Sequence, residues 1–153
     1  MASLKEKLLK LRGFLTRERW CKGSYVLKNG KSLVPSHYSP HEVQKFFKEQ
    51  IPDPDRVDCQ FCITGAMLYL DIYTFSVLSV IARKAYEIKY KPGYAHFVNC
   101  DHIVISFFND SMETKYEDVI EVIDKTIEDI LIIEKNDGGN AFTRVGDMIE
   151  RLA

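Results

Sequence analysis

The chain has 153 residues, of which 46% are hydrophobic and 28% charged, and its formal net charge is −1. These values fit one globular domain that buries a core without disulfides, so we expect a single domain over residues 1–153, which the patterns described below predict to be helical. The balanced charge gives no strong signal for a nucleic-acid partner. No apolar run approaches the roughly 18 residues of a membrane span. Four cysteines without an export signal predict free thiols and a cytoplasmic protein.

The N-terminal segment carries a stripe of leucines. They recur at spacings of four, three and four, at Leu4, Leu8, Leu11 and Leu15. This pattern predicts a helix over residues 3–17. The dipeptide Asn29-Gly30 then favours a tight turn whose two central positions need positive φ. We therefore expect a short β-hairpin near residues 24–35.

Two capping boxes mark later helices. Ser39 followed by Pro40 and Glu42 predicts a helix that ends before Ile51-Pro52, and Thr114 with Glu117 predicts a long, isoleucine-rich helix. Further helices are expected over residues 58–70, 74–88 and 141–152. Residues 102–108 fit either a buried strand or a short helix, as does the wider segment 94–108. The chain is thus predicted to be mainly α, a compact bundle of about six helices.

Three short motifs carry a family resemblance. They are Trp20-Cys21-Lys22-Gly23, Cys62-Ile63-Thr64-Gly65-Ala66 and Phe108-Asn109-Asp110. In this order, over roughly residues 5–130, they resemble a small uncharacterised bacterial domain family with the pattern Trp-Cys-x-Gly, Cys-x-x-Gly-Ala and Asn-Asp. Arg19 stands where that pattern usually has Gly, and Phe108 replaces its Trp. The resemblance implies a compact helical domain with no assigned activity, and it transfers no catalytic residue.

The motif residues themselves are typical of packing and turns. Trp20 can bury its indole while donating the ring N–H. Gly65 and Ala66 would let another helix approach closely. Asn109 and Asp110 can cap or form a turn before the long helix. We therefore interpret these residues first as fold determinants.

The cysteines suggest two alternative chemistries. Thiolate and imidazole ligands suit tetrahedral zinc, and the candidate ligands are Cys59, Cys62, Cys100 and His102. Alternatively, Cys62 at a helix N-terminus is the nucleophile of a cysteine-dependent hydrolase or transferase, with His102 as base and Asn109 or Asp110 orienting it. Against both hypotheses stands the commoner case of a buried, inert cysteine.

The predicted long helix carries a row of acidic residues. Their spacing of four, three and four places them on one face, at Glu117, Glu121, Asp124 and Glu128. Such a row is usually solvated surface, but it could also dock a basic protein partner. Ile132 and Ile133 lie off the main apolar stripe, which suits a homodimer or a central helix. We therefore rank a non-enzymatic protein-interaction or binding module without a cofactor first, ahead of the cysteine enzyme and the zinc-stabilised domain.

Overall fold

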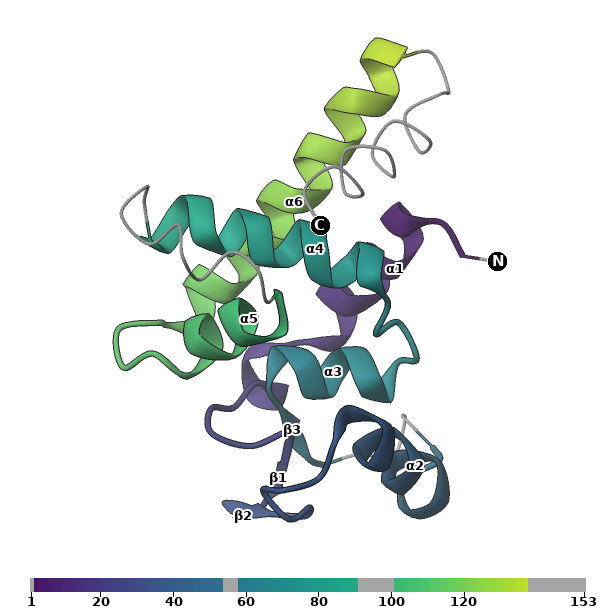
Figure 1. The fold of residues 1–153 in the computed structure, drawn as a ribbon, viewed down its shortest axis with the longest axis vertical. Helices are drawn as coiled ribbons and strands as arrows, with labels where there is room; N and C mark the ends of the chain where they lie inside the picture. Colours follow the sequence, from purple (N-terminus) through teal and green to yellow (C-terminus); the bar gives the residue numbers. More distant parts are fainter. Residues whose placement is uncertain (1, 54–57, 91–100, 138–153) are drawn as a thin grey trace.

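The computed structural model describes residues 2–53, 58–90 and 101–137 (Figure 1). Within these ranges lie six α-helices: α1 (Leu4–Phe14), α2 (Pro40–Gln50), α3 (Ile63–Tyr69), α4 (Phe75–Ala85), α5 (Asp101–Asp110) and α6 (Tyr116–Asp137). The strands are β1 (Val26–Lys28), β2 (Lys31–Ser32) and β3 (Gln60–Phe61), and two short helical turns are η1 (Arg17–Arg19) and the π-helix η3 (Tyr86–Tyr90). The prediction of a mainly α, compact fold is confirmed.

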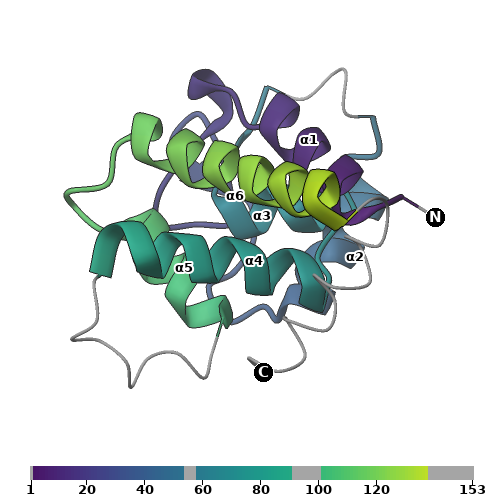
Figure 2. The ribbon, with the colours of Figure 1, turned by 90° about the horizontal axis from the view of Figure 1, so that it is seen from above.

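The helices pack around one hydrophobic core. Helix α6 lies between α1 and α4 (Figure 2), and α3 contacts α1, α2 and α5. The predicted leucine stripe is confirmed, because Leu4, Leu8, Leu11 and Leu15 are all buried. Helix α1 ends at Phe14, earlier than predicted, and the chain then turns through η1.

The small sheet forms around the predicted turn. Asn29 has φ 53° and Gly30 has φ 79°, so both occupy the left-handed region that the turn requires. This confirms the hairpin, with β1 and β2 antiparallel and β3 pairing antiparallel with the other edge of β1. The predicted helix over residues 58–70 is wrong at its start. There Phe61 is fully buried in β3, and α3 begins only at Ile63.

The two predicted capping boxes differ in outcome. Ser39 and Glu42 form the box at the start of α2, as predicted. The second box is wrong: Thr114 is buried, and its hydroxyl finds no hydrogen-bond partner among the described residues. Instead, the backbone N–H of Lys115 donates to Asp118 Oδ2 at 2.8 Å.

The remaining predictions concern the second half of the chain. The predicted helix over residues 74–88 is divided between α4 and η3, and the ambiguous run 102–108 is helical, within α5. Residues 94–100 and the predicted helix over 141–152 lie outside the described residues. None of the helices in the described ranges combines the length and apolar character needed to span a bilayer.

Candidate functional site

The three sequence motifs meet at the side chain of Asn109, near the end of α5. Its Oδ1 accepts hydrogen bonds from Trp20 Nε1 at 2.8 Å and from the backbone N–H of Ile63 at 3.0 Å. Its Nδ2 donates to the carbonyl of Cys21 at 3.0 Å and to Asp110 Oδ1 at 2.9 Å. An amide side chain offers two donors and two lone pairs, so Asn109, which is 1% exposed, uses its full capacity. We call this arrangement the Asn109 junction.

Further contacts reinforce the junction. The backbone N–H of Gly23 donates to Asp110 Oδ1 at 2.9 Å, and Lys22 Nζ donates to the carbonyl of Ser111 at 2.6 Å. On the other side, Trp20 forms a parallel bridge with Phe61. The segment 20–23, which precedes β1, therefore contacts both the end of α5 and the strand β3.

Gly65 allows a backbone segment to approach α3 closely, but the segment is not the one predicted. The expected neighbour of Gly65-Ala66 was another helix, but the neighbour is the backbone of Tyr25, just before β1. A Cβ atom on Gly65 would lie 2.0 Å from the carbonyl oxygen of Tyr25 and 2.9 Å from its carbonyl carbon. Only glycine therefore allows α3 and the start of β1 to lie this close together.

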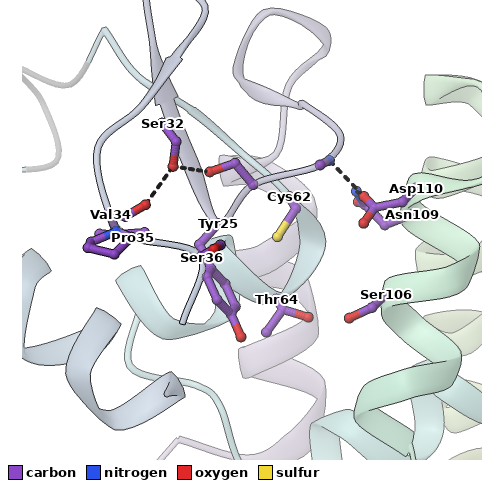
Figure 3. Close-up of a pocket in the computed structure, with 12 residues that line it drawn as sticks. Tyr25, Ser32, Val34, Pro35, Ser36, Cys62, Thr64, Ser106, Asn109 and Asp110 are labelled. Atoms are coloured by element: carbon purple, nitrogen blue, oxygen red, sulfur yellow. Dashed lines mark hydrogen bonds between the residues drawn. The ribbon is translucent and has the colours of Figure 1, made fainter. Parts of the chain in front are cut away.

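A pocket of about 270 Å³ lies beside the Asn109 junction (Figure 3). Its walls come from the loops around the hairpin, the start of α3 and the end of α5. The hydroxyl groups that line it belong to Ser24, Tyr25, Ser32, Ser36, Thr64 and Ser106. Asp110 contributes a carboxylate, and buried Cys62 contributes a thiol. The lining is thus rich in groups that can form hydrogen bonds.

Several of these hydroxyls have no hydrogen-bond partner among the described residues. Ser24 and Ser32 bond to each other at 2.7 Å and to nearby carbonyls. By contrast, four hydroxyls form no hydrogen bond with any described residue, those of Tyr25, Ser36, Thr64 and Ser106. Figure 3 shows the hydroxyls of Thr64 and Ser106 pointing toward one another across the pocket. Four hydroxyls without a described hydrogen-bond partner thus line the same pocket.

Cys62 is the N-cap residue of α3, as predicted, and its Sγ accepts a hydrogen bond from the N–H of Gly65 at 3.2 Å. Burial nevertheless raises the pKa of this thiol to about 12. The Gly65 N–H opposes that increase, whereas the Asp110 carboxylate adds to it. The pKa of neighbouring Cys21 also rises to about 12, chiefly through burial. Both groups are therefore neutral thiols at physiological pH, whereas an activated nucleophile needs a depressed pKa.

His102 lies at the other end of α5 from the pocket. Its Nδ1 is 3.4 Å from the hydroxyl of Tyr73. It precedes Asn109 by seven residues, which is roughly 10 Å along a helix axis. The pocket lining therefore brings together Cys62, Asn109 and Asp110, and within the described part of the chain His102 is not among them.

One of the four candidate zinc ligands lies outside the described residues. Cys59 and Cys62 are both buried free thiols, but Cys100 lies outside the described residues. Among the residues that are described, no group of three His, Cys, Asp or Glu side chains could hold a metal ion. Zinc binding stays a prediction.

The acidic row of α6 is largely matched by cations of the same chain. The ion pairs are Arg17–Glu117, Arg12–Asp124 at 2.7 Å and Lys125–Glu128 at 3.8 Å. Glu121 is exposed and forms no ion pair within the described ranges. Exposed pairs of this kind contribute at most about 1 kcal/mol each, so they neutralise the surface more than they stabilise the fold.

The sequence did not reveal most of the pocket. Tyr25, Ser36 and Ser106 belong to no motif, and isolated hydroxyl residues are common on protein surfaces. Thr64 lies inside the second motif, so the motif was the one signal that could have drawn attention to it. Asn109 and Asp110 were predicted as fold determinants and as catalytic candidates, and Cys62 as a candidate nucleophile or zinc ligand.

The raised thiol pKa predicts a pH-dependent stability. Because the pKa of Cys62 rises from 9.0 to about 12 on folding, unfolding releases its proton at alkaline pH. The free energy of unfolding should therefore fall with increasing pH between these values, by about 1.4 kcal/mol per pH unit for this thiol. We expect Cys62→Ser, whose hydroxyl can still cap α3, to lessen the slope by about 1 kcal/mol per pH unit in urea unfolding between about pH 9 and pH 10, where the unfolded thiol is still partly protonated. Equal slopes for the two proteins between about pH 9 and pH 10 would contradict the prediction. Below about pH 8 the thiol is protonated in both the folded and the unfolded state, so there the two proteins should have equal slopes, which serves as the control.

Comparison with known proteins identifies the domain. The chain matches no curated protein and no solved structure. A family model described as "Family of unknown function (DUF6197)" matches residues 1–129. This span contains all three motifs, the sheet, α1 to α5 and the first part of α6, so the Asn109 junction and the pocket both lie within it. The prediction of an uncharacterised domain family is confirmed: the chain belongs to the DUF6197 family of unknown function.

Proposed function

We propose that this domain is a binding module that holds a small polar molecule in the pocket beside the Asn109 junction. The observation that supports the proposal is a set of four hydroxyls around one cavity that form no hydrogen bond with a described residue: those of Tyr25, Ser36, Thr64 and Ser106. Thr64 is buried, Tyr25 and Ser106 are partly buried, and Ser36 is exposed. Buried polar groups are normally paired within the protein or with water, so the Thr64 hydroxyl is the one of the four that most needs a partner. Convergent free donors and acceptors in a concave site are the usual means of fixing a small ligand.

The same geometry favours recognition over bond cleavage. The thiol of Cys62 is neutral at physiological pH, and His102 stands away from it. The neighbouring Asn109 is fully used in holding three segments together, so it supports the shape of the pocket. We therefore place the domain among non-enzymatic binding proteins of the cytoplasm, where buried thiols such as Cys62 stay reduced.

A protein partner at the acidic row has weaker support. Glu117, Asp124 and Glu128 already face cations of their own chain, and this leaves Glu121 as the acidic side chain of the row without a described partner. A basic partner would have to displace these internal pairs, and exposed ion pairs return little energy in exchange. The pocket is the better-supported binding site.

A screen for small polar ligands tests the proposal. We expect some sugars, polyols, amino alcohols or amino acids to shift the amide resonances of Thr64, Ser106 and Asp110 in two-dimensional NMR spectra. Ser106→Ala should weaken such binding about threefold to tenfold, since it removes one hydrogen bond worth about 1 kcal/mol. Ser79→Ala is the matched control, because that hydroxyl donates to Asp101 at 2.8 Å and does not line the pocket. A screen in which no compound moves the pocket resonances would refute the proposal.

A further inference from the structure

We infer that the ligand of this pocket carries a protonated amine together with hydroxyl groups, an inference that rests on the proposed function. Its starting point is the charge of the lining. Asp110 contributes one carboxylate, and no Lys, Arg or His from the described part of the chain lines the pocket. The site therefore presents a single negative charge beside neutral hydroxyls.

The Asp110 carboxylate is exposed and is oriented by hydrogen bonds, but no cation from the described residues pairs with it. Its Oδ1 accepts hydrogen bonds from the Gly23 N–H and from Asn109 Nδ2, each at 2.9 Å. Neither contact uses Oδ2, and Asp110 forms no ion pair with any described residue. Lys22 is the cation beside Gly23 in sequence, but its Nζ donates to the Ser111 carbonyl and lies 5.6 Å from the centroid of the Trp20 ring. One carboxylate oxygen thus remains available to an incoming donor.

The hydroxyl groups define the rest of the ligand. Tyr25, Thr64 and Ser106 each offer a group that can both donate and accept, which matches the hydroxyls of a polyol or sugar. Burial raises the pKa of Tyr25, so its phenol stays a neutral donor. The volume of about 270 Å³ is roughly nine times the share of one water molecule in the liquid, which suits a molecule the size of a monosaccharide.

Charge also determines which ligands the pocket rejects. An ammonium group can form a charge-assisted hydrogen bond with Asp110, and because this carboxylate is exposed, the added charge contributes at most about fivefold in affinity, or about 1 kcal/mol. A carboxylate or phosphate would instead bring a second negative charge to a site whose described lining holds no cation. We therefore assign amino sugars or amino alcohols as the ligand class, with sugar acids and sugar phosphates excluded.

Three monosaccharides that share a ring and most hydroxyls test this assignment: glucosamine, glucose and glucuronate. Titrations followed by NMR at mildly acidic pH, where the amine is protonated, would give the dissociation constants. We expect glucosamine to bind about threefold to fivefold more tightly than glucose, and glucuronate to bind more weakly than both. A result in which glucose or glucuronate equals or exceeds glucosamine would overturn the assignment, while binding in the pocket would stand.

A matched pair of variants identifies the responsible charge. Asp110→Asn keeps an oxygen acceptor for the Gly23 N–H but removes the charge, so glucosamine should lose about threefold to fivefold in affinity and glucose should change little. Glu121→Gln removes an equal charge from the exposed side of α6 and should alter neither affinity. If Asp110→Asn preserves the preference for glucosamine, the assignment fails. If the Asp110→Asn variant does not fold, the dissociation constants of the three monosaccharides for the unaltered protein still test the assignment. If none of the three binds, the assignment is wrong, and the wider screen decides separately on the pocket.

Discussion

Replacing Asn109 with leucine is expected to lower the free energy of unfolding by about 3–5 kcal/mol, although the two side chains are similar in size. The amide of Asn109 satisfies the indole N–H of Trp20, the backbone N–H of Ile63 and the carbonyl of Cys21. A leucine leaves all three without their partner. Each buried polar group that loses its hydrogen bond costs about 1–3 kcal/mol, and the part-buried indole recovers some of this from water.

Urea unfolding measures this loss as a shift of the midpoint at constant slope. Gln44→Leu is the matched control, because it also converts an amide to leucine but removes one exposed hydrogen bond, to Asp71 Oδ1 at 2.7 Å. We expect the control to cost less than about 1 kcal/mol. Similar costs for the two substitutions would show that the Asn109 junction contributes no more than a surface contact.

The elements that the sequence predicts well are those set by local patterns. The leucine spacing of α1, the capping box at Ser39 and the turn at Asn29-Gly30 each act within a few residues, and each prediction is confirmed. The strand β3 is different, because it has only two residues and depends on packing from distant parts of the chain. The ring of Phe61 lies 5.3 Å from that of Phe14 and 5.7 Å from that of Phe47, measured between ring centroids. No local pattern contains such contacts.

The same distinction applies to the candidate site. The motifs drew attention to Trp20, Cys62 and Asn109 but did not show what these residues do. The hydrogen bond between Trp20 and Asn109 joins positions 89 residues apart, so no local pattern could reveal it. The thiol of Cys62 illustrates a second limit. Its place at a helix start was predictable, whereas the burial that raises its pKa comes from tertiary structure. Position in sequence thus indicated the site, and its chemistry emerged only from packing.

Gly65→Ala is expected to destabilise the protein by about 3 kcal/mol or more, through one added methyl group. That methyl carbon would lie 2.0 Å from the carbonyl oxygen of Tyr25, which belongs to the backbone and cannot swing aside as a side chain would. The neighbouring Val26 pairs with Phe61 in the sheet, so a displacement of Tyr25 strains the β1–β3 pairing as well. Because Tyr25 also lines the pocket, the variant should lose affinity for any ligand that binds there.

Gly13→Ala is the matched control and should have the opposite sign. Gly13 also lies in a helix, α1, and neither glycine has φ in the left-handed region. A Cβ on Gly13 would meet no atom within 4 Å, so the substitution should stabilise the protein by about 0.5–1 kcal/mol through the better helix propensity of alanine. The two variants thus make the same chemical change and differ in the space around it. Urea midpoints that move in opposite directions would support the contact between α3 and Tyr25. If both variants shift the midpoint alike, α3 and Tyr25 are not in contact, and the pocket loses the wall that Tyr25 provides.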